Sequence, residues 1–176
     1  MSESEIPNSE SIVVGGGCFW CTEAAYRMVP GVLSVESGYA VGDDPAPTYE
    51  KICGGQTGHA EVVRVTYDPT QVELARILAL FWKMHDPTTL NRQGADTGTQ
   101  YRSIILWADE AQRVAAAASR AEADAAWGGK VVTELAELTT FYPAEVYHDD
   151  YFARNPQAGY CQMVIAPKLD KFRREI

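Results

Sequence analysis

Three consecutive glycines, Gly15 to Gly17, stand between a short apolar run and a cysteine, and they constrain the chain more than any other feature. The run Ile12-Val13-Val14 predicts a buried strand that enters a tight turn, because glycine adopts positive φ angles without steric cost. Apolar residues at helical spacing over 19–29, closed by Pro30-Gly31, predict a helix directly after this turn. The chain therefore opens as strand, glycine turn and helix, with Cys18 at the junction.

The spacing of apolar residues in the rest of the chain predicts both strands and helices. Strands are expected over 32–41, 61–67, 101–107 and 131–138, and helices over 74–84 and 109–126. Residues 86–100 are polar and rich in glycine, which predicts a long loop, and the chain from Phe141 to Lys168 predicts irregular structure.

From this pattern we expect an α+β fold in which a mixed β-sheet and packed helices form a two-layer sandwich. Its core would be ferredoxin-like and would carry a long irregular C-terminal segment. The predicted organisation is a flexible N-terminal tail over 1–10 and a single catalytic domain over 11–176.

Composition excludes several classes of partner. Fifteen Lys and Arg residues against 24 Asp and Glu residues give a formal net charge of −9, which disfavours nucleic acid and anionic membrane surfaces. No stretch approaches the roughly 18 apolar residues of a membrane span, and the acidic start lacks the basic and apolar regions of a signal peptide. Four cysteines are too few for a disulfide scaffold in 176 residues, so we expect a cytoplasmic protein. We also expect a monomer.

Cys18 is the candidate nucleophile. Unpaired N–H groups at a helix N-terminus favour an anion, which predicts a lowered pKa and a reactive thiolate. The competing interpretation is a small buried hydrophobic residue. Cys21 completes a Cys-Phe-Trp-Cys run, whose spacing suits a disulfide or half of a zinc site. Since no second close pair of ligands follows, we expect no bound metal, although a zinc-stabilised interaction module stays open.

Glu61 shares one strand face with Val63, Val65 and Tyr67. If that face is buried, desolvation raises the pKa of Glu61 and makes it a general acid; if Glu61 lies at the strand's wet end, it faces solvent. His59 is the nearest candidate base for Cys18, which would give a cysteine hydrolase or acyltransferase instead.

The other polar and aromatic candidates are ambiguous when each is taken alone. Phe19 and Trp20 form either an apolar substrate pocket or the core face of their helix. Tyr49, Tyr101 and Asp96 carry no signal by themselves. The run His148-Asp149-Asp150 is expected on a solvated surface.

Together these residues resemble the A class of peptide methionine sulfoxide reductases over roughly residues 11 to 161. The matching stretches, in order, are Gly16-Gly17-Cys18-Phe19-Trp20 with Glu23, Gly38-Tyr39, Pro47-Thr48-Tyr49 through Cys53, Thr57-Gly58-His59-Ala60-Glu61, Phe81-Trp82 with His85-Asp86-Pro87, Arg92-Gln93-Gly94 with Asp96, Gly98-Thr99-Gln100-Tyr101-Arg102-Ser103, Phe141-Tyr142-Pro143-Ala144-Glu145 with His148, Asn155-Pro156, and Tyr160-Cys161.

The resemblance implies reduction of methionine-S-sulfoxide, in proteins and as the free amino acid, and hence repair of oxidised proteins. Cys18 would attack the sulfoxide sulfur, and Glu61 would protonate the oxygen. Tyr49 and Tyr101 would hydrogen-bond that oxygen, and Asp96 would order them. Phe19 and Trp20 would hold the substrate methyl group.

The resemblance also implies a recycling step without a bound cofactor. Cys18 is left as a sulfenic acid, a second cysteine condenses with it to an intramolecular disulfide, and thioredoxin or another dithiol reduces that bridge. Cys161 matches the usual recycling position and is expected to act first. Cys21 is the alternative, although a bridge to Cys18 would strain a regular helix. Cys53 is expected to be structural.

Overall fold

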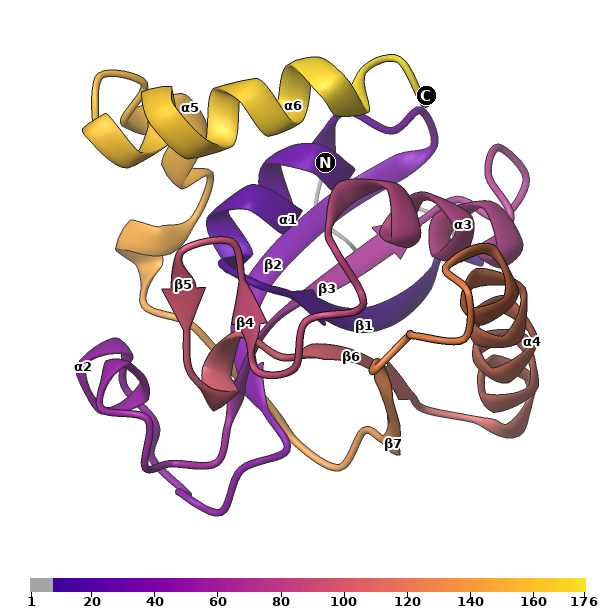
Figure 1. The fold of residues 1–176 in the computed structure, drawn as a ribbon, viewed down its shortest axis with the longest axis horizontal. Coiled ribbons are helices and arrows are strands. Elements are labelled where there is room, and N and C mark those ends of the chain that lie inside the picture. The colour runs from indigo at the N-terminus through magenta and orange to yellow at the C-terminus, as the bar shows by residue number, and fades with distance from the viewer. Residues whose placement is uncertain (1–7) are drawn as a thin grey trace.

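A computed structural model describes residues 8–176 as one mixed β-sheet with helices packed against it (Figure 1). Most of the predicted tail over 1–10 lies outside the described residues, and Glu10 already begins the first strand. The strands of the main sheet are β1 (Glu10–Gly16), β2 (Val32–Ala40), β3 (Ala60–Tyr67), β6 (Ser103–Trp107), β7 (Glu134–Glu137) and β8 (Phe141–Pro143). The α-helices are α1 (Phe19–Arg27), α2 (Tyr49–Cys53), α3 (Leu74–Met84), α4 (Glu110–Ala126), α5 (Tyr151–Arg154) and α6 (Ala166–Phe172).

The sheet has the order β7-β6-β1-β3-β2-β8, with β1 and β3 at its centre. Every neighbouring pair is antiparallel except β6 with β7, which run parallel, so the predicted mixed sheet is confirmed. In the register of β1 with β3, Val14 lies opposite Val63. This register brings the glycine turn after β1 beside the first residues of β3.

The core explains why the helices form where they do. Ile77, Leu78, Leu80 and Phe81 are buried along one side of α3, and the predicted bounds of 74–84 are confirmed. Tyr26 at the buried face of α1 donates a 2.9 Å hydrogen bond to the carbonyl of Ile77, which ties the two helices together. No helix in the described part of the chain is long and apolar enough to cross a membrane.

The irregular C-terminal segment was predicted wrongly. After β7 the chain forms β8, then a 3₁₀ turn at Val146–His148, α5, a π-helical turn at Cys161–Ile165, and α6. Three residues are too few to show a strand period, and Pro167 obscures α6 in sequence because proline is tolerated in a helix's first turn. Short-range hydrogen bonding in these turns leaves little periodic signal.

Two short elements between the main strands were also missed. Helix α2 has only five residues and starts at Thr48, whose hydroxyl accepts a hydrogen bond from the Lys51 N–H at 3.3 Å. The predicted loop over 86–100 contains the hairpin of β4 (Arg92–Gln93) and β5 (Asp96–Thr97), followed by a 3₁₀ turn at Thr99–Tyr101.

Attachment of β8 depends on Gly38. A Cβ atom at Gly38 would lie 2.4 Å from Cζ of Phe141 and 2.6 Å from the carbonyl oxygen of Tyr142. We therefore expect Gly38→Ala to lower the free energy of unfolding by about 1–3 kcal/mol, as overpacking does. Gly159→Ala, where the new Cβ meets nothing within 4 Å, should stay within about 0.5 kcal/mol of wild type. Urea unfolding of both variants checks this, and equal stabilities would contradict it.

Candidate active site

The turn before Cys18 requires glycine at one position. Gly17 has a φ of +98°, and a Cβ there would lie 2.8 Å from Cβ of Gln93. Gln93 is itself locked in place, since its side chain accepts a hydrogen bond from the Asp86 N–H at 2.8 Å and donates one to the Asp86 carbonyl at 2.7 Å. The glycine turn thus holds the half-buried Cys18 against the β4–β5 hairpin.

Glu61, near the start of β3, is buried and does not face solvent. Its side chain is 1% exposed, and the Phe19 N–H at the start of α1 donates a 3.2 Å hydrogen bond to Oε1. Burial, together with the nearby charge of Asp96, raises the pKa of Glu61 to about 8 against the opposing effect of the Phe19 hydrogen bond. The carboxyl is therefore mostly neutral at pH 7, and the general-acid interpretation of Glu61 has the required protonation state.

The predicted lowering of the pKa of Cys18 is wrong for this structure. Burial raises the pKa of Cys18, as do its hydrogen bond with Cys21 and the charge of Glu61. Cys18 stands at the N-cap position of α1, where a backbone hydrogen bond from Trp20 acts to lower its pKa, but burial has the larger and opposite effect. Cys21, inside that turn, has a lowered pKa because it is hydrogen-bonded by Cys18, although its burial acts in the opposite direction.

Three tyrosines line the polar side of the site. Burial raises the pKa values of Tyr49 and Tyr101, and both hydroxyls also feel the charges of Glu61 and Cys18, which places them near these two groups. Tyr160 donates a 2.6 Å hydrogen bond to Oδ2 of Asp96 and also lies within hydrogen-bond reach of Cys21. The structure thus brings all three predicted polar residues together, while Tyr160 was not recognised as a site residue.

An aromatic cluster covers the other side of the site. Phe19 is 1% exposed, whereas Trp20 is partly exposed and stacks on Tyr151 at a ring-centroid distance of 3.8 Å. The Trp20 indole N–H donates a 3.0 Å hydrogen bond to Nδ1 of His148. His148 is fully buried, so its predicted place on a solvated surface is wrong. Its ring lies 4.4 Å from that of Tyr49.

Two carboxylates, the buried Glu23 and the partly buried Glu145, connect this cluster to the rest of the protein by hydrogen bonds. Glu23 on α1 accepts hydrogen bonds from Arg27 at 2.9 Å, Ser37 at 3.2 Å and the Asp150 N–H at 2.7 Å. Glu145 accepts one from the Tyr49 N–H at 3.1 Å. Through these bonds the C-terminal segment is held over α1 and α2.

His59 is not a base for Cys18. Its ring is 1% exposed, with Nδ1 accepting a 2.9 Å hydrogen bond from the Gly42 N–H and Nε2 lying 2.8 Å from the Asp44 carbonyl. Both ring nitrogens are thus engaged by backbone, which removes the geometric basis of the hydrolase interpretation. Among the described residues no cluster of three or more His, Cys, Asp or Glu side chains is arranged to hold a metal ion.

The recycling candidates lie in the same core. All four cysteines are free; Cys21 is 7% exposed, and Cys161 is fully buried at the start of the π-helical turn instead of in a loop. Cys53 is exposed and its side chain is hydrogen-bonded to the Tyr49 hydroxyl.

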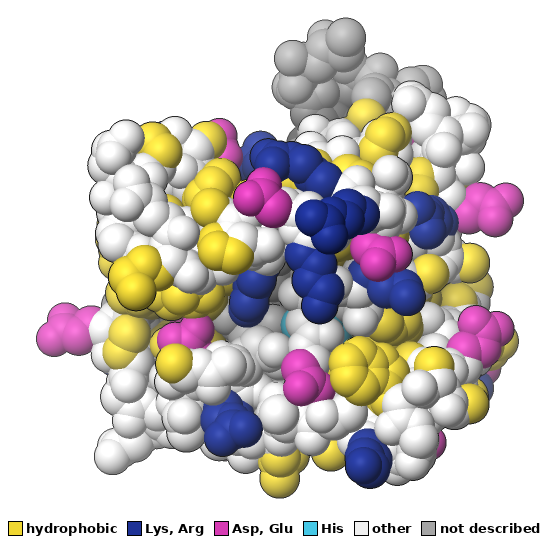
Figure 2. Space-filling view, turned by 45° about the horizontal axis from the view of Figure 1, so that its top comes forward, with side chains coloured by type: hydrophobic (Ala, Val, Ile, Leu, Met, Phe, Trp, Pro, Cys, Tyr) yellow, Lys and Arg dark blue, Asp and Glu magenta, His cyan; other side chains and the backbone are white. Residues whose placement is uncertain are grey.

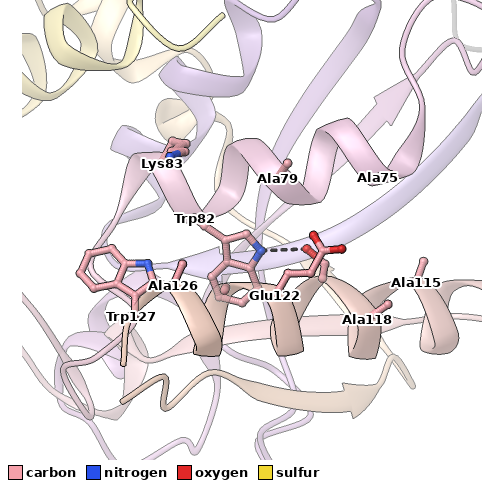
Figure 3. A pocket seen from close by; sticks show the side chains of 11 residues that line it. Ala75, Ala79, Trp82, Lys83, Ala115, Ala118, Glu122, Ala126 and Trp127 are labelled. Atoms are coloured by element: carbon pink, nitrogen blue, oxygen red, sulfur yellow. Dashed lines mark hydrogen bonds between the residues drawn. The ribbon is translucent and has the colours of Figure 1, made fainter. Parts of the chain in front are cut away.

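A large hollow elsewhere on the molecule is not part of this site. It has a volume of about 630 Å³ and lies between α3 and α4, where alanines, Trp82 and Trp127 line it (Figure 3). Trp82 donates a 2.8 Å hydrogen bond to Ser119 across the two helices. None of the predicted site residues borders this hollow.

The fold and the site define a class of protein: a thiol-dependent α+β enzyme whose cysteine has a neutral carboxylic acid and tyrosine hydroxyls near it, while the predicted histidine base, His59, is engaged by backbone. Comparisons with known proteins agree. The sequence model of the family described as "Peptide methionine sulfoxide reductase" matches residues 10–176. A protein from Saccharolobus solfataricus named "Peptide methionine sulfoxide reductase MsrA" is 52% identical over 165 residues, which cover 94% of this chain and 93% of that protein.

Solved structures are similar as well. The reduced form of Mxr1 from Saccharomyces cerevisiae superposes with a TM-score of 0.82 and 38% identity, covering 87% of this chain and 89% of that one. Mxr1 in complex with Trx2 gives a TM-score of 0.60 and 25% identity, covering 86% and 92%. The chain belongs to the peptide methionine sulfoxide reductase family, in its MsrA class, and is a methionine sulfoxide reductase.

Burial of Glu61 makes a prediction about stability. A pKa raised on folding contributes stability that is complete below the unfolded-state value near 4.5 and is lost as pH rises through about 8. Relative to Glu61→Gln, the wild-type free energy of unfolding should therefore fall by on the order of 3 kcal/mol between pH 5 and pH 8, since one unit of pKa difference is worth about 1.4 kcal/mol.

Urea unfolding of both proteins at the two pH values measures this difference, and the variant itself cancels the contributions of all other titrating groups. If the difference in the free energy of unfolding between wild type and Glu61→Gln were the same at both pH values, Glu61 would have an ordinary pKa in the folded protein, which would contradict the prediction.

Proposed function

We propose that this enzyme reduces the S epimer of methionine sulfoxide, in oxidised proteins and as the free amino acid, with Cys18 as nucleophile and Glu61 as proton donor. The observation that carries this proposal is the buried Glu61 carboxyl, which is held by the Phe19 N–H and has a pKa of about 8. Reduction of a sulfoxide needs a soft nucleophile at sulfur and a proton at oxygen, and a neutral acid next to a thiol supplies both.

In the proposed reaction the Cys18 sulfur attacks the sulfoxide sulfur while Glu61 delivers a proton to the oxygen. The oxygen passes to Cys18, which is oxidised by two electrons to a sulfenic acid, and methionine leaves reduced by two electrons. A neutral Glu61 also removes the negative charge that raises the pKa of Cys18, so acid and nucleophile assist each other.

The surrounding residues are proposed to orient the sulfoxide. Tyr49 and Tyr101 would donate hydrogen bonds to its oxygen, and their raised pKa values keep both hydroxyls protonated. Asp96 would order this side of the site through its 2.6 Å bond from Tyr160. Phe19 and Trp20 would hold the methyl group, since their rings belong to one aromatic cluster beside Cys18.

Recycling is proposed to run through an intramolecular disulfide that involves Cys161, with Cys21 as the alternative partner of Cys18, and thioredoxin or another dithiol as the final reductant. The complex of the similar protein Mxr1 with Trx2 supports thioredoxin as the partner. We further propose a cytoplasmic monomer, which is consistent with four free thiols, and no bound cofactor.

A ferredoxin-like core within a single domain over 11–176 is also proposed. It is supported by the antiparallel order β6-β1-β3-β2, in which α1 connects β1 to β2 and α3 lies between β3 and β6 in the chain.

The first test is methionine formation from separated S and R epimers of methionine sulfoxide, with a small dithiol as reductant. We expect methionine from the S epimer only, and no turnover by Cys18→Ser, because a hydroxyl is a poor nucleophile for sulfur. Cys53→Ser, at the exposed cysteine, serves as the control. Reduction of neither epimer by the folded, reduced protein would contradict the proposal.

Glu61→Gln tests the proton donor separately. The amide keeps the size of the side chain but cannot release a proton, so the single-turnover rate should fall by about 10²- to 10⁴-fold. In the wild-type enzyme the rate should also decline above pH 8 as Glu61 ionises, and the variant should lack this decline. A variant within threefold of the wild-type rate would exclude Glu61 as the acid.

A further inference from the structure

One face of the molecule carries a basic hollow, although the chain as a whole is acidic. This hollow has a volume of about 290 Å³ and is lined by Lys83 near the end of α3 and by Lys168 and Lys171 on α6. Figure 2 shows Lys and Arg side chains gathered on this face. Because the chain has a formal net charge of −9, a local excess of cations favours an anionic ligand at this place and not elsewhere.

The lysines of the basic hollow are not neutralised by the protein itself. Among the described residues none of the three forms an ion pair, whereas Arg102 pairs with Glu134 at 3.2 Å. The lining includes one carboxylate, Asp86, whose Oδ1 accepts hydrogen bonds from the N–H and the hydroxyl of Thr88. Burial lowers the pKa of the lining His85 to about 4, so this ring is neutral at pH 7. Three ammonium groups against one carboxylate therefore leave a net charge of +2.

The basic hollow continues into the apolar hollow between α3 and α4. Lys83 and Trp127 line both of them. Figure 3 shows these two side chains at one end of the apolar hollow, with Ala75 and Ala115 at the other end. Trp127 is 40% exposed, so its ring forms an accessible wall between the two parts. Together the two hollows form one surface, the two-part groove, whose ligand needs an acidic part next to an apolar part.

The basic hollow also borders the turn that holds Cys18. Gln93 lines the hollow, and a Cβ atom at Gly17 would lie 2.8 Å from Cβ of Gln93. The Gln93 side chain is fixed by its two hydrogen bonds with the backbone of Asp86. Since this side chain lies between the hollow and the glycine turn, a few residues of extended polypeptide, at about 3.3 Å each, lead from one to the other.

We propose that the two-part groove is a docking site for oxidised substrate proteins and binds a segment with acidic residues close to the methionine sulfoxide and apolar residues beyond them. The acidic side chains lie among the three lysines of the basic hollow, and the apolar side chains lie against Trp127 between α3 and α4. This inference rests on the proposed reductase function, because it names the protein segments that are presented best to Cys18. Free methionine sulfoxide has no flanking chain and gains nothing from the groove.

The size of the groove favours a substrate segment over a second copy of this chain. Hollows of about 630 and 290 Å³ accommodate the side chains of a short peptide. A stable dimer needs a broad matched face of roughly 800 Å² on each partner. The position of the basic hollow beside the glycine turn gives a substrate segment a reason to lie there, which a second copy lacks.

The first experiment compares kinetics on three substrates. One peptide carries a single methionine-S-sulfoxide flanked on each side by glutamates and then leucines, the second has glutamine in place of each glutamate, and the third substrate is free methionine-S-sulfoxide. The proteins are wild type, Lys83→Gln/Lys171→Gln, and the control Arg113→Gln/Lys130→Gln. The control loses the same charge at two exposed positions that line neither hollow.

Wild type should have the lower KM for the glutamate peptide, although enzyme and peptide are both acidic. In Lys83→Gln/Lys171→Gln this KM should rise by about 3- to 10-fold, the size expected for two exposed charge pairs, with kcat unchanged. The KM for free methionine-S-sulfoxide should stay within about twofold in every protein, because removal of a docking contact affects only ligands that reach it. In about 1 M salt, where the Debye length is about 3 Å, the preference for glutamate should disappear.

A second experiment measures docking without turnover. The fluorescence anisotropy of a labelled glutamate peptide with methionine in place of its sulfoxide is followed as enzyme is added. Ala118→Glu places a carboxylate in the apolar hollow and should weaken binding, whereas Ala117→Glu, an exposed neighbour on α4 outside the hollow, should bind as wild type does. Equal binding by these two variants would exclude the apolar part of the groove.

Equal KM values of wild type for the glutamate and glutamine peptides would overturn the proposal. So would an equal rise of KM in both double variants, because the effect would then come from net charge and not from this surface. A wild-type dimer at low salt that Lys83→Gln/Lys171→Gln converts to a monomer would assign the groove to a second copy instead. Reduction of none of the three substrates would contradict the reductase function, while the anisotropy measurement still reports docking, so the two failures are distinguishable.

Discussion

Removal of the Glu61 carboxyl from water is the interaction on which the rest of the site depends. A carboxyl that is 1% exposed and receives one hydrogen bond, from the Phe19 N–H, among the described residues cannot easily carry a charge, so it retains its proton up to a pH of about 8. This burial follows from packing, because the start of α1 lies against the Glu61 carboxyl on that face of β3. The same environment that makes Glu61 an acid also raises the pKa of Cys18.

The C-terminal segment completes the site by a few long-range hydrogen bonds. His148 accepts a hydrogen bond from the Trp20 indole. The Asp150 N–H donates one to Glu23, and the Tyr160 hydroxyl donates one to Asp96. Each bond joins residues more than 60 positions apart in sequence, and each links the last third of the chain to the region around α1 or the β4–β5 hairpin. The surroundings of Cys18 therefore depend on a C-terminal segment built from short helices and turns.

The sequence predicted those parts of the molecule whose periodicity or turn chemistry is local. The glycine turn before Cys18 and the amphipathic stripe of α3 were found correctly, and Glu61 was recognised as the unusual residue of its strand. Burial of Glu61 was left open, because spacing alone does not reveal that β3 is covered on that face. Only the structure shows it.

What the sequence failed to predict depends on tertiary contacts. His148 was placed in solvent because a histidine followed by two aspartates is usually exposed, but Trp20 and Tyr49 enclose it. Tyr160 gave no signal as a single tyrosine; its proximity to Asp96 and Cys21 arises from the packing of the C-terminal segment. The pKa of Cys18 was misjudged because helix position alone does not include desolvation, which is the largest influence on this thiol.

The central claim is that Glu61 is a neutral acid beside the nucleophile at physiological pH. The most direct measurement is a titration of this carboxyl by carbon-13 NMR on protein labelled at glutamate side chains, with the Glu61 signal assigned by its absence in Glu61→Gln. We predict that the Glu61 signal titrates with a pKa of about 8. Titration near the ordinary glutamate value of about 4.3 would contradict the account, since the site would then hold a carboxylate with no proton to deliver.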